Sequence, residues 1–456
     1  MFKILTAALT AALLTASGTA PAFADMAADS RALVFGPPAK ARAALDTIVR
    51  ERRTDALPAL VLGMRNAGRR SSASRAEYAR AFTALTGTPV TGWFDAMEWQ
   101  EAHPEITPHP SFRRIKLESL RRIDPEFMRF LGGERSDPAT MKIRLEEISW
   151  GGVMVDGIPS LDNPALISAR QASYLVEDDL VFGIEINGDA RAYPLRIMGW
   201  HEMFNDVIGG KPVALAYCTL CGAGVLYETS VPGQAQPFVF GSSGFLYRSN
   251  KLMFDRQTDS LWNQFTGKPV AGPLVNSGIE LKTLPVAITS WSEWRRKHPD
   301  TRVLSLETGH RRNYGSGVVY NDYFGSPDLM FPSLGGGKGL AQKDYVFGLR
   351  LPGGAKAYPL KVFQGGRAVN DRVGLRDVVL IGNADTRTVR AYDSGGRQFT
   401  GGTLDAMTDT SGIVWQVGEE ALVSPTGQRL PRLPGHIAYW FGWQSFTGGQ
   451  SEFYDG

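Results

Sequence analysis

The two cysteines of the chain lie close together in the run Cys218-Thr219-Leu220-Cys221-Gly222. This run follows the apolar segment 213–217, which predicts a strand that ends in a tight turn. Such a turn presents two sulfur atoms to one point, and the glycine lets backbone amides face them. The spacing allows metal binding, thiol–disulfide exchange or a structural disulfide. The structural-disulfide interpretation is weakened by its energetics, because so short a loop gives little chain-entropy stabilisation.

His201 is the residue we expect to complete a metal site with Cys218 and Cys221. The alternative for this histidine is a buried structural role. Water, Glu202 or Met253 is the candidate fourth ligand. Two thiolates and one imidazole with an open position suit Zn(II), and a weak thioether in addition suits copper. The soft ligands and the expected extracytoplasmic setting favour copper over zinc.

Three further polar residues are candidates for catalysis. Glu202 follows His201 directly, so we expect it to orient the imidazole or to carry a proton. Asp255 and Arg256 are expected to position a polar substrate, with structural pairing of the two as the alternative. Hydrolase and nucleotide-binding interpretations find no support, because the chain contains neither a G-x-S-x-G elbow nor a phosphate-binding loop.

An internal repeat provides the scaffold for these residues. Residues 181–215 align without a gap to residues 346–380, and both contain the block Ala-Tyr-Pro-Leu and an Asn-Asp pair. Within this alignment only the first copy has His201 and Glu202, where the second has Gly366 and Arg367. The cysteines that follow the first copy have no counterpart in the second. The asymmetry predicts a functional first copy and a second copy that is degenerate at the site.

The sequence patterns of the elements that position the site predict an α+β protein. Apolar residues recur at helical spacing between residues 38 and 131, whereas glycine, proline and short β-type segments dominate from about residue 151. Asn187-Gly188 predicts a hairpin turn. We therefore predict a helical N-terminal domain followed by a duplicated β-rich module, arranged as a pseudo-twofold pair. The expected boundaries are 1–24 (signal peptide), 25–145 (helical), 146–335 (copy one, with the Cys/His site) and 336–456 (copy two).

The N-terminus predicts export. Lys3 precedes an apolar run, and Ala22-Phe23-Ala24 fits a cleavage site for a secretory signal peptide. We therefore expect a periplasmic or secreted protein without an integral membrane segment after cleavage. A net charge of +3 gives no reason to expect a nucleic-acid partner, and 43% hydrophobic residues exclude a disordered chain. The expected partner is a small-molecule or thiol substrate, and the oligomeric state stays open.

Four stretches carry a resemblance to a known family: 157–164 (GIPSLDNP), 186–222, 240–264 and 298–309. Together they closely resemble an exported prokaryotic family catalogued as a domain of unknown function, number three-one-seven-nine. The family usually has proline where this chain has Thr219. The resemblance implies the fold and the site more than an activity.

The function expected from the residues is that of an exported metal-binding protein, with a copper-dependent oxidoreductase as its enzymatic form. A metal-free thiol–disulfide oxidoreductase that uses the Cys218 and Cys221 pair is one alternative. A non-enzymatic metal carrier or envelope-binding module is the other.

Overall fold

The N-terminal part of the protein is helical in the computed structural model, which describes residues 26–67, 72–447 and 449–456. The proposed signal peptide lies outside the described residues. Within α2, the buried residues Ala41, Ala44, Leu45 and Ile48 form one face, as the spacing predicts. The helices of this part are α1 (Met26–Phe35), α2 (Pro38–Arg50), α3 (Leu57–Ala67), α4 (Ser72–Thr86), α5 (Trp93–Ala102), α6 (Phe112–Arg121) and α7 (Met128–Leu131).

The first half of the β-rich part, which follows the helical part, contains three sheets. Their strand orders are β1-β9-β10-β11-β12, β13-β8-β7-β6-β2 and β14-β4-β5-β15-β3. The strands are β1 (Ile148–Trp150), β2 (Leu161–Asp162), β3 (Leu166–Ser168), β4 (Leu180–Ile186), β5 (Asp189–Pro194), β6 (Met203–Ile208), β7 (Lys211–Cys218), β8 (Ala223–Glu228), β9 (Phe240–Tyr247), β10 (Asn250–Asp255), β11 (Leu261–Asn263), β12 (Lys268–Ala271), β13 (Lys282–Leu284), β14 (Ala287–Ser290) and β15 (Arg302–Leu304). The helices are α8 (Leu195–His201), α9 (Trp291–Lys297) and α10 (Asn321–Gly325).

The predicted hairpin turn is confirmed between β4 and β5. Ile186 pairs with Asp189, and the two turn residues, Asn187 and Gly188, have φ values of 51° and 78°. Positive φ at both central positions is what a two-residue hairpin turn requires.

The last part of the chain forms two further sheets, with the strand orders β26-β16-β17-β27 and β18-β19-β20-β25-β24-β23-β22-β21. It ends with α11 (Trp440–Thr447) and β27. The strands are β16 (Tyr345–Leu351), β17 (Gly354–Pro359), β18 (Arg367–Val373), β19 (Arg376–Asn383), β20 (Thr388–Asp393), β21 (Phe399–Gly402), β22 (Ala406–Asp409), β23 (Val414–Val417), β24 (Ala421–Val423), β25 (Arg429–Leu433), β26 (His436–Tyr439) and β27 (Glu452–Phe453).

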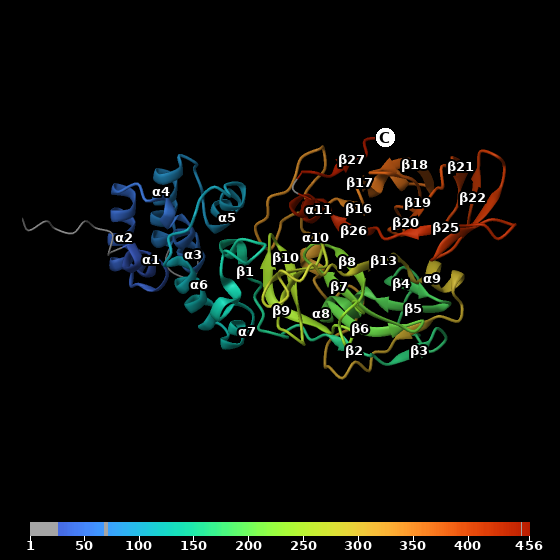
Figure 1. The fold of residues 1–456 in the computed structure, drawn as a ribbon, viewed down its shortest axis with the longest axis horizontal. Helices are drawn as coiled ribbons and strands as arrows, with labels where there is room; N and C mark the ends of the chain where they lie inside the picture. Colours follow the sequence, from blue (N-terminus) through green and yellow to red (C-terminus); the bar gives the residue numbers. More distant parts are fainter. Residues whose placement is uncertain (1–25, 68–71, 448) are drawn as a thin grey trace, which may run out of the picture.

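The two β-rich halves share buried contacts. One hydrophobic cluster combines Phe182 and Leu215 of the first half with Phe347 and Leu380 of the second. The backbone N–H of Tyr439 in β26 donates to the carbonyl of Cys221 at 2.7 Å. The cysteine turn is therefore packed directly against the second half (Figure 1).

The chain is α+β, as predicted, with its longer helices in the N-terminal part and its sheets in the remainder. Across residues 26–67, 72–447 and 449–456, no helix combines the length and the apolar character that a membrane span requires. The predicted domain boundaries stay interpretations of the sequence.

Candidate functional site

The two cysteines lie at the tip of the β7–β8 hairpin. Cys218 is the last residue of β7 and pairs with Ala223, and the Cys221 N–H donates to the Cys218 carbonyl at 3.2 Å. Gly222 has a φ of 58°, and a Cβ atom there would lie 3.1 Å from the Tyr345 ring. The turn therefore needs glycine for its backbone conformation and has little room for a side chain.

The sulfur atoms of Cys218 and Cys221 are 2.8 Å apart, and both residues are free cysteines. The residues are 2% and 0% exposed. Burial raises the pKa of Cys221 well above its usual value, and neighbouring Cys218 and Glu202 raise it further. Its S–H group donates to the Ser249 carbonyl at 3.3 Å. Cys221 is thus held in the thiol form in buried surroundings.

Glu202 provides a buried carboxylate for the same site. It caps the end of α8, and its carbonyl accepts a hydrogen bond from the Tyr217 N–H at 2.7 Å. One carboxylate oxygen accepts from the Thr219 hydroxyl at 2.6 Å, and the other lies 3.0 Å from the Lys251 ammonium group. The Glu202 and Lys251 side chains are only 7% and 4% exposed. A charged pair and the dithiol turn are therefore linked through Thr219.

Strained backbone surrounds the cysteine turn. Glu202, Arg248, Ser249 and Tyr320 have φ values of 54°, 50°, 61° and 53°, although none is glycine. Glu202 contacts Thr219, and Ser249 provides the carbonyl that accepts from Cys221. Non-glycine residues in the left-handed region cost conformational energy and are enriched at functional sites.

Aromatic side chains cover the turn. The Tyr323 hydroxyl, from α10, donates to the Leu220 carbonyl at 2.6 Å. The Lys343 ammonium group lies 3.7 Å from the Tyr323 ring centre and donates to the Ser326 carbonyl at 2.6 Å. The chain segment that joins the two β-rich halves is thereby fastened over the two thiols.

His201 does not join the cysteines in a three-ligand group. One ring nitrogen lies 2.9 Å from the Pro159 carbonyl, and the other lies 2.6 Å from the Tyr314 hydroxyl. Burial lowers the pKa of His201 to about 4, so the ring is neutral. In the described part of the chain, no group of three or more His, Cys, Asp or Glu side chains is placed to hold a metal ion. The predicted role of His201 as a metal ligand stays a prediction.

Asp255 and Arg256 contact other residues and do not pair with each other, as the alternative had it. The buried Asp255 carboxylate accepts hydrogen bonds from Thr258 and from the Trp262 indole N–H, the latter at 2.8 Å. Arg256 forms an ion pair with Asp156 at 2.9 Å. These contacts stabilise a turn and a loop, so we do not carry the substrate-positioning role further.

Sequence reasoning missed Lys251, Thr219 as a hydrogen-bond donor, and Tyr323. The sequence carried a signal for Lys251, because this charged residue directly precedes the apolar residues 252–254 in strand β10. Charged residues are rarely buried without a partner. Nothing local marked Tyr323, whose contact with Leu220 spans more than one hundred residues.

The fold and the site define an α+β protein with a buried dithiol beside a buried ion pair. The chain belongs to the family described as "Protein of unknown function (DUF3179)", whose profile matches residues 155–450. The predicted family is thereby confirmed. No curated protein matches the chain, and no solved structure does.

Proposed function

We propose that the protein is a thiol-based oxidoreductase whose redox group is the Cys218 and Cys221 pair. The observation that carries the proposal is the 2.8 Å separation of two free sulfur atoms. A disulfide bond needs about 2.05 Å, so a small movement within the turn would form it. In the reaction, Cys218 and Cys221 join in a disulfide and give two electrons and two protons to an external disulfide. That external disulfide becomes two thiols.

Glu202 is the proton acceptor in this proposal. Attack on a disulfide requires a thiolate, and burial opposes thiolate formation at Cys221. The Glu202 carboxylate is close enough to influence the pKa of Cys221. Lys251 fixes that carboxylate and balances its charge. Thr219 lies between the two cysteines in the chain and connects the turn to the carboxylate.

The substrate class is a small disulfide or its dithiol. The sulfur that is attacked must be reachable, and both cysteines are closed off in the resting structure. The segment that carries Tyr323 covers the turn, and the Tyr323 hydroxyl donates to the Leu220 carbonyl. Local opening of this segment is therefore the step that admits substrate.

Binding of Cu(I) by the two thiolates is the second candidate function. Soft thiolate ligands select Cu(I), and two cysteine sulfur atoms converge here. His201 is engaged by Pro159 and Tyr314, which disfavours the Cys₂His arrangement that zinc would use. A non-enzymatic carrier would share this two-thiolate geometry.

Duplication of a β-rich unit is part of the proposal, and matching contacts support it. The Tyr193 hydroxyl donates to Asp206 at 2.6 Å, and the Tyr358 hydroxyl donates to Asp371 at 2.8 Å. An added Cβ at Gly183 would collide with Trp294, and one at Gly348 would collide with Trp443 in the same way. We infer that the first copy kept the dithiol function and the second became its support.

The place of action in the proposal is outside the cytoplasm. It rests on the N-terminal pattern of Lys3, an apolar run and Ala22-Phe23-Ala24. In such a compartment, a dithiol pair meets an oxidising environment and changes state with it.

The test is to purify the protein from its native compartment and to measure metal content and free thiols on the same sample. The chain has two cysteines in all, so every thiol signal belongs to this pair. The redox proposal predicts a metal-free protein whose thiols are lost to oxidised glutathione and regained with dithiothreitol. Stoichiometric copper that disappears in both Cys218→Ser and Cys221→Ser would instead establish the second candidate.

A further inference from the structure

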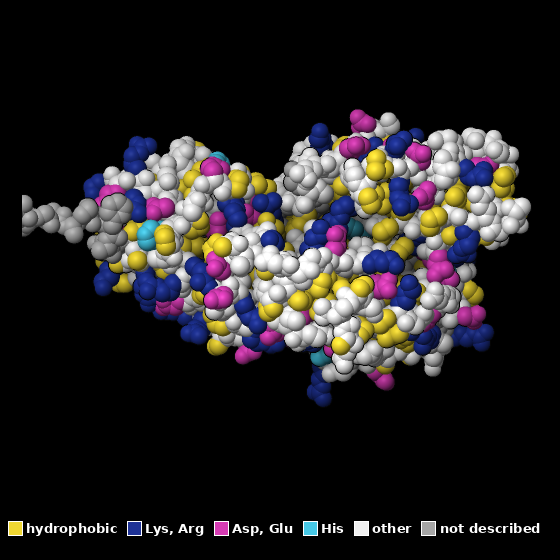
Figure 2. All heavy atoms as spheres, viewed as in Figure 1, with side chains coloured by type: hydrophobic (Ala, Val, Ile, Leu, Met, Phe, Trp, Pro, Cys, Tyr) yellow, Lys and Arg dark blue, Asp and Glu magenta, His cyan; other side chains and the backbone are white. Residues whose placement is uncertain are grey.

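A cleft of about 810 Å³ lies between the two β-rich halves, and its lining residues do not include those of the dithiol turn. Residues of β8 and β13 line one side, and residues of β16, β25 and β26 line the other. Figure 2 shows the hollow between the two halves, with cationic and acidic side chains gathered in it. A volume of this size is typical of sites for small organic ligands.

The walls of the cleft combine apolar and charged residues. Val225, Phe265, Leu284 and Leu433 contribute to them, together with several prolines. The His436 ring lies between Phe265 and Trp443, with ring centres 5.2 and 5.7 Å away. Flat side chains thus face a space that has room for a flat apolar group.

Arg350 brings an uncompensated positive charge to the cleft. It donates a hydrogen bond to the Phe265 carbonyl at 2.6 Å. No carboxylate of the described residues lies within ion-pair distance of Arg350. By contrast, two other cations of the cleft have acidic partners: Arg376 pairs with Asp393 at 2.6 Å and Lys282 with Glu228 at 3.3 Å. The remaining donors of the Arg350 guanidinium are therefore suited to an anionic ligand.

His436 supplies a second, independent sign of a ligand. The residue is only 7% exposed and lines the cleft, and its Nε2 atom has no hydrogen-bond partner among the described residues. Burial and the charge of Arg350 lower the pKa of His436 to about 3, so the ring is neutral. A buried polar atom without a partner is uncommon in folded proteins and calls for an explanation.

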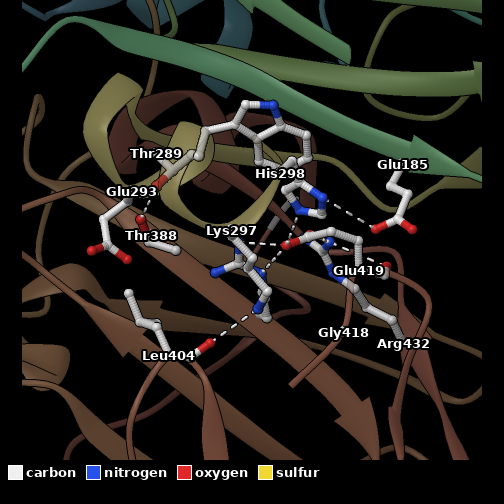
Figure 3. A network of polar contacts seen from close by, with 12 residues as sticks. Glu185, Thr289, Glu293, Lys297, His298, Thr388, Leu404, Gly418, Glu419 and Arg432 are labelled. Atoms are coloured by element: carbon white, nitrogen blue, oxygen red, sulfur yellow. Dashed lines mark hydrogen bonds and ion pairs between the residues drawn. The ribbon is translucent and has the colours of Figure 1, made fainter. Parts of the chain in front are cut away.

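Three of the four acidic residues that line the cleft have cationic partners, and the fourth, Glu185, lies 3.7 Å from the His298 ring. Glu419 is buried in a network with Arg432 and His298 (Figure 3), and the Arg390 guanidinium lies 2.6 Å from its carboxylate. Glu280 pairs with Lys268 at 3.0 Å, and Glu420 pairs with Arg429 at 3.5 Å. The charge of Arg350 therefore stays available to an anionic ligand.

We propose that this cleft binds a small organic anion with a flat apolar body, whose carboxylate is held by Arg350. The flat body lies against Phe265 and His436. The site is separate from the dithiol function and does not depend on it.

Calorimetric titration of the whole protein with naphthoate and with its neutral counterpart naphthalenemethanol tests the proposal. We expect wild type to bind naphthoate more tightly than the alcohol. Arg350→Gln should weaken naphthoate at least about tenfold, since a charge-assisted contact is lost, and leave the alcohol unchanged. Arg376→Gln is the matched control, because that cation already has Asp393 as its partner. It should change naphthoate affinity by less than about threefold.

Two further variants keep the outcomes distinct. Leu351→Trp places a bulky ring in the cleft and should abolish binding of both probes. The double variant Cys218→Ser/Cys221→Ser should bind naphthoate as tightly as wild type does. The binding proposal therefore holds or fails independently of the redox proposal. No binding of naphthoate at millimolar concentration, equal affinity for the two probes, or unchanged binding to Arg350→Gln overturns the proposal.

Discussion

Removal of the Glu202 charge should destabilise the fold and favour the Cys221 thiolate at equilibrium, although it also removes the group that accepts the proton in turnover. The Lys251 ammonium group lies 3.0 Å from the carboxylate, and both side chains are almost fully buried. At an effective dielectric constant of about 20, unit charges at this separation attract by roughly 5 kcal/mol. Glu202→Gln leaves Lys251 buried and unpaired, which we expect to lower the free energy of unfolding by about 3–5 kcal/mol.

The same substitution should lower the pKa of Cys221. The negative charge of Glu202 is one of the causes that raise this pKa, so its removal favours the thiolate. The pH dependence of maleimide labelling should therefore shift to lower pH in Glu202→Gln.

Urea unfolding and labelling rates on the same samples provide the assay, with Glu202→Gln/Lys251→Met as the control. The double variant replaces both charges and should recover most of the lost stability. The reasoning is refuted if Glu202→Gln unfolds within about 1 kcal/mol of wild type. It is equally refuted if the labelling profile stays unchanged or shifts to higher pH.

Three further perturbations test the cover, a buried acid and the assignment of Asp255. Tyr323→Phe removes the hydroxyl contact to Leu220, which is worth about 1 kcal/mol, so maleimide labelling should rise about fivefold. The control Tyr314→Phe should leave the labelling rate unchanged. Equal labelling rates in the two variants would contradict the role of Tyr323 in covering the thiols. Burial raises the pKa of Glu101 to about 8 from 4.5, so the folded state holds a proton that the unfolded chain releases. Stability should then fall by up to about 5 kcal/mol as pH rises through this window, and Glu101→Gln should abolish that fall in urea unfolding at a series of pH values; an unaltered pH profile would contradict it. Asp255→Asn should cost about 2 kcal/mol of unfolding free energy through its contacts with Thr258 and Trp262, with no change in the labelling rate; altered thiol reactivity would return Asp255 to the site.

Local signals in the sequence predicted much of the fold. The helical spacing of Ala41, Ala44, Leu45 and Ile48 corresponds to the buried face of α2. Asn187-Gly188 forms the predicted turn because these residues tolerate positive φ at low cost. The cysteine turn after an apolar strand was predictable for the same reason, since its geometry depends on five consecutive residues.

Long-range contacts limited the prediction of the site. His201 was expected beside the cysteines, but its ring is fixed by Pro159 and by Tyr314, which lies 113 residues further along the chain. Lys251 reaches Glu202 across a separation of 49 residues. Spacing along the chain carries no information on which of two polar groups a buried side chain contacts, because tertiary packing decides it.

Equilibration of the folded protein in a series of dithiothreitol and glutathione buffers tests the central claim most directly. After acid quenching, intact mass distinguishes the dithiol from the disulfide that has lost two hydrogens. The account predicts one reversible two-electron transition, with no dimer formation and no unfolding. A pair that stays in one state across all buffers while the protein remains folded would contradict it.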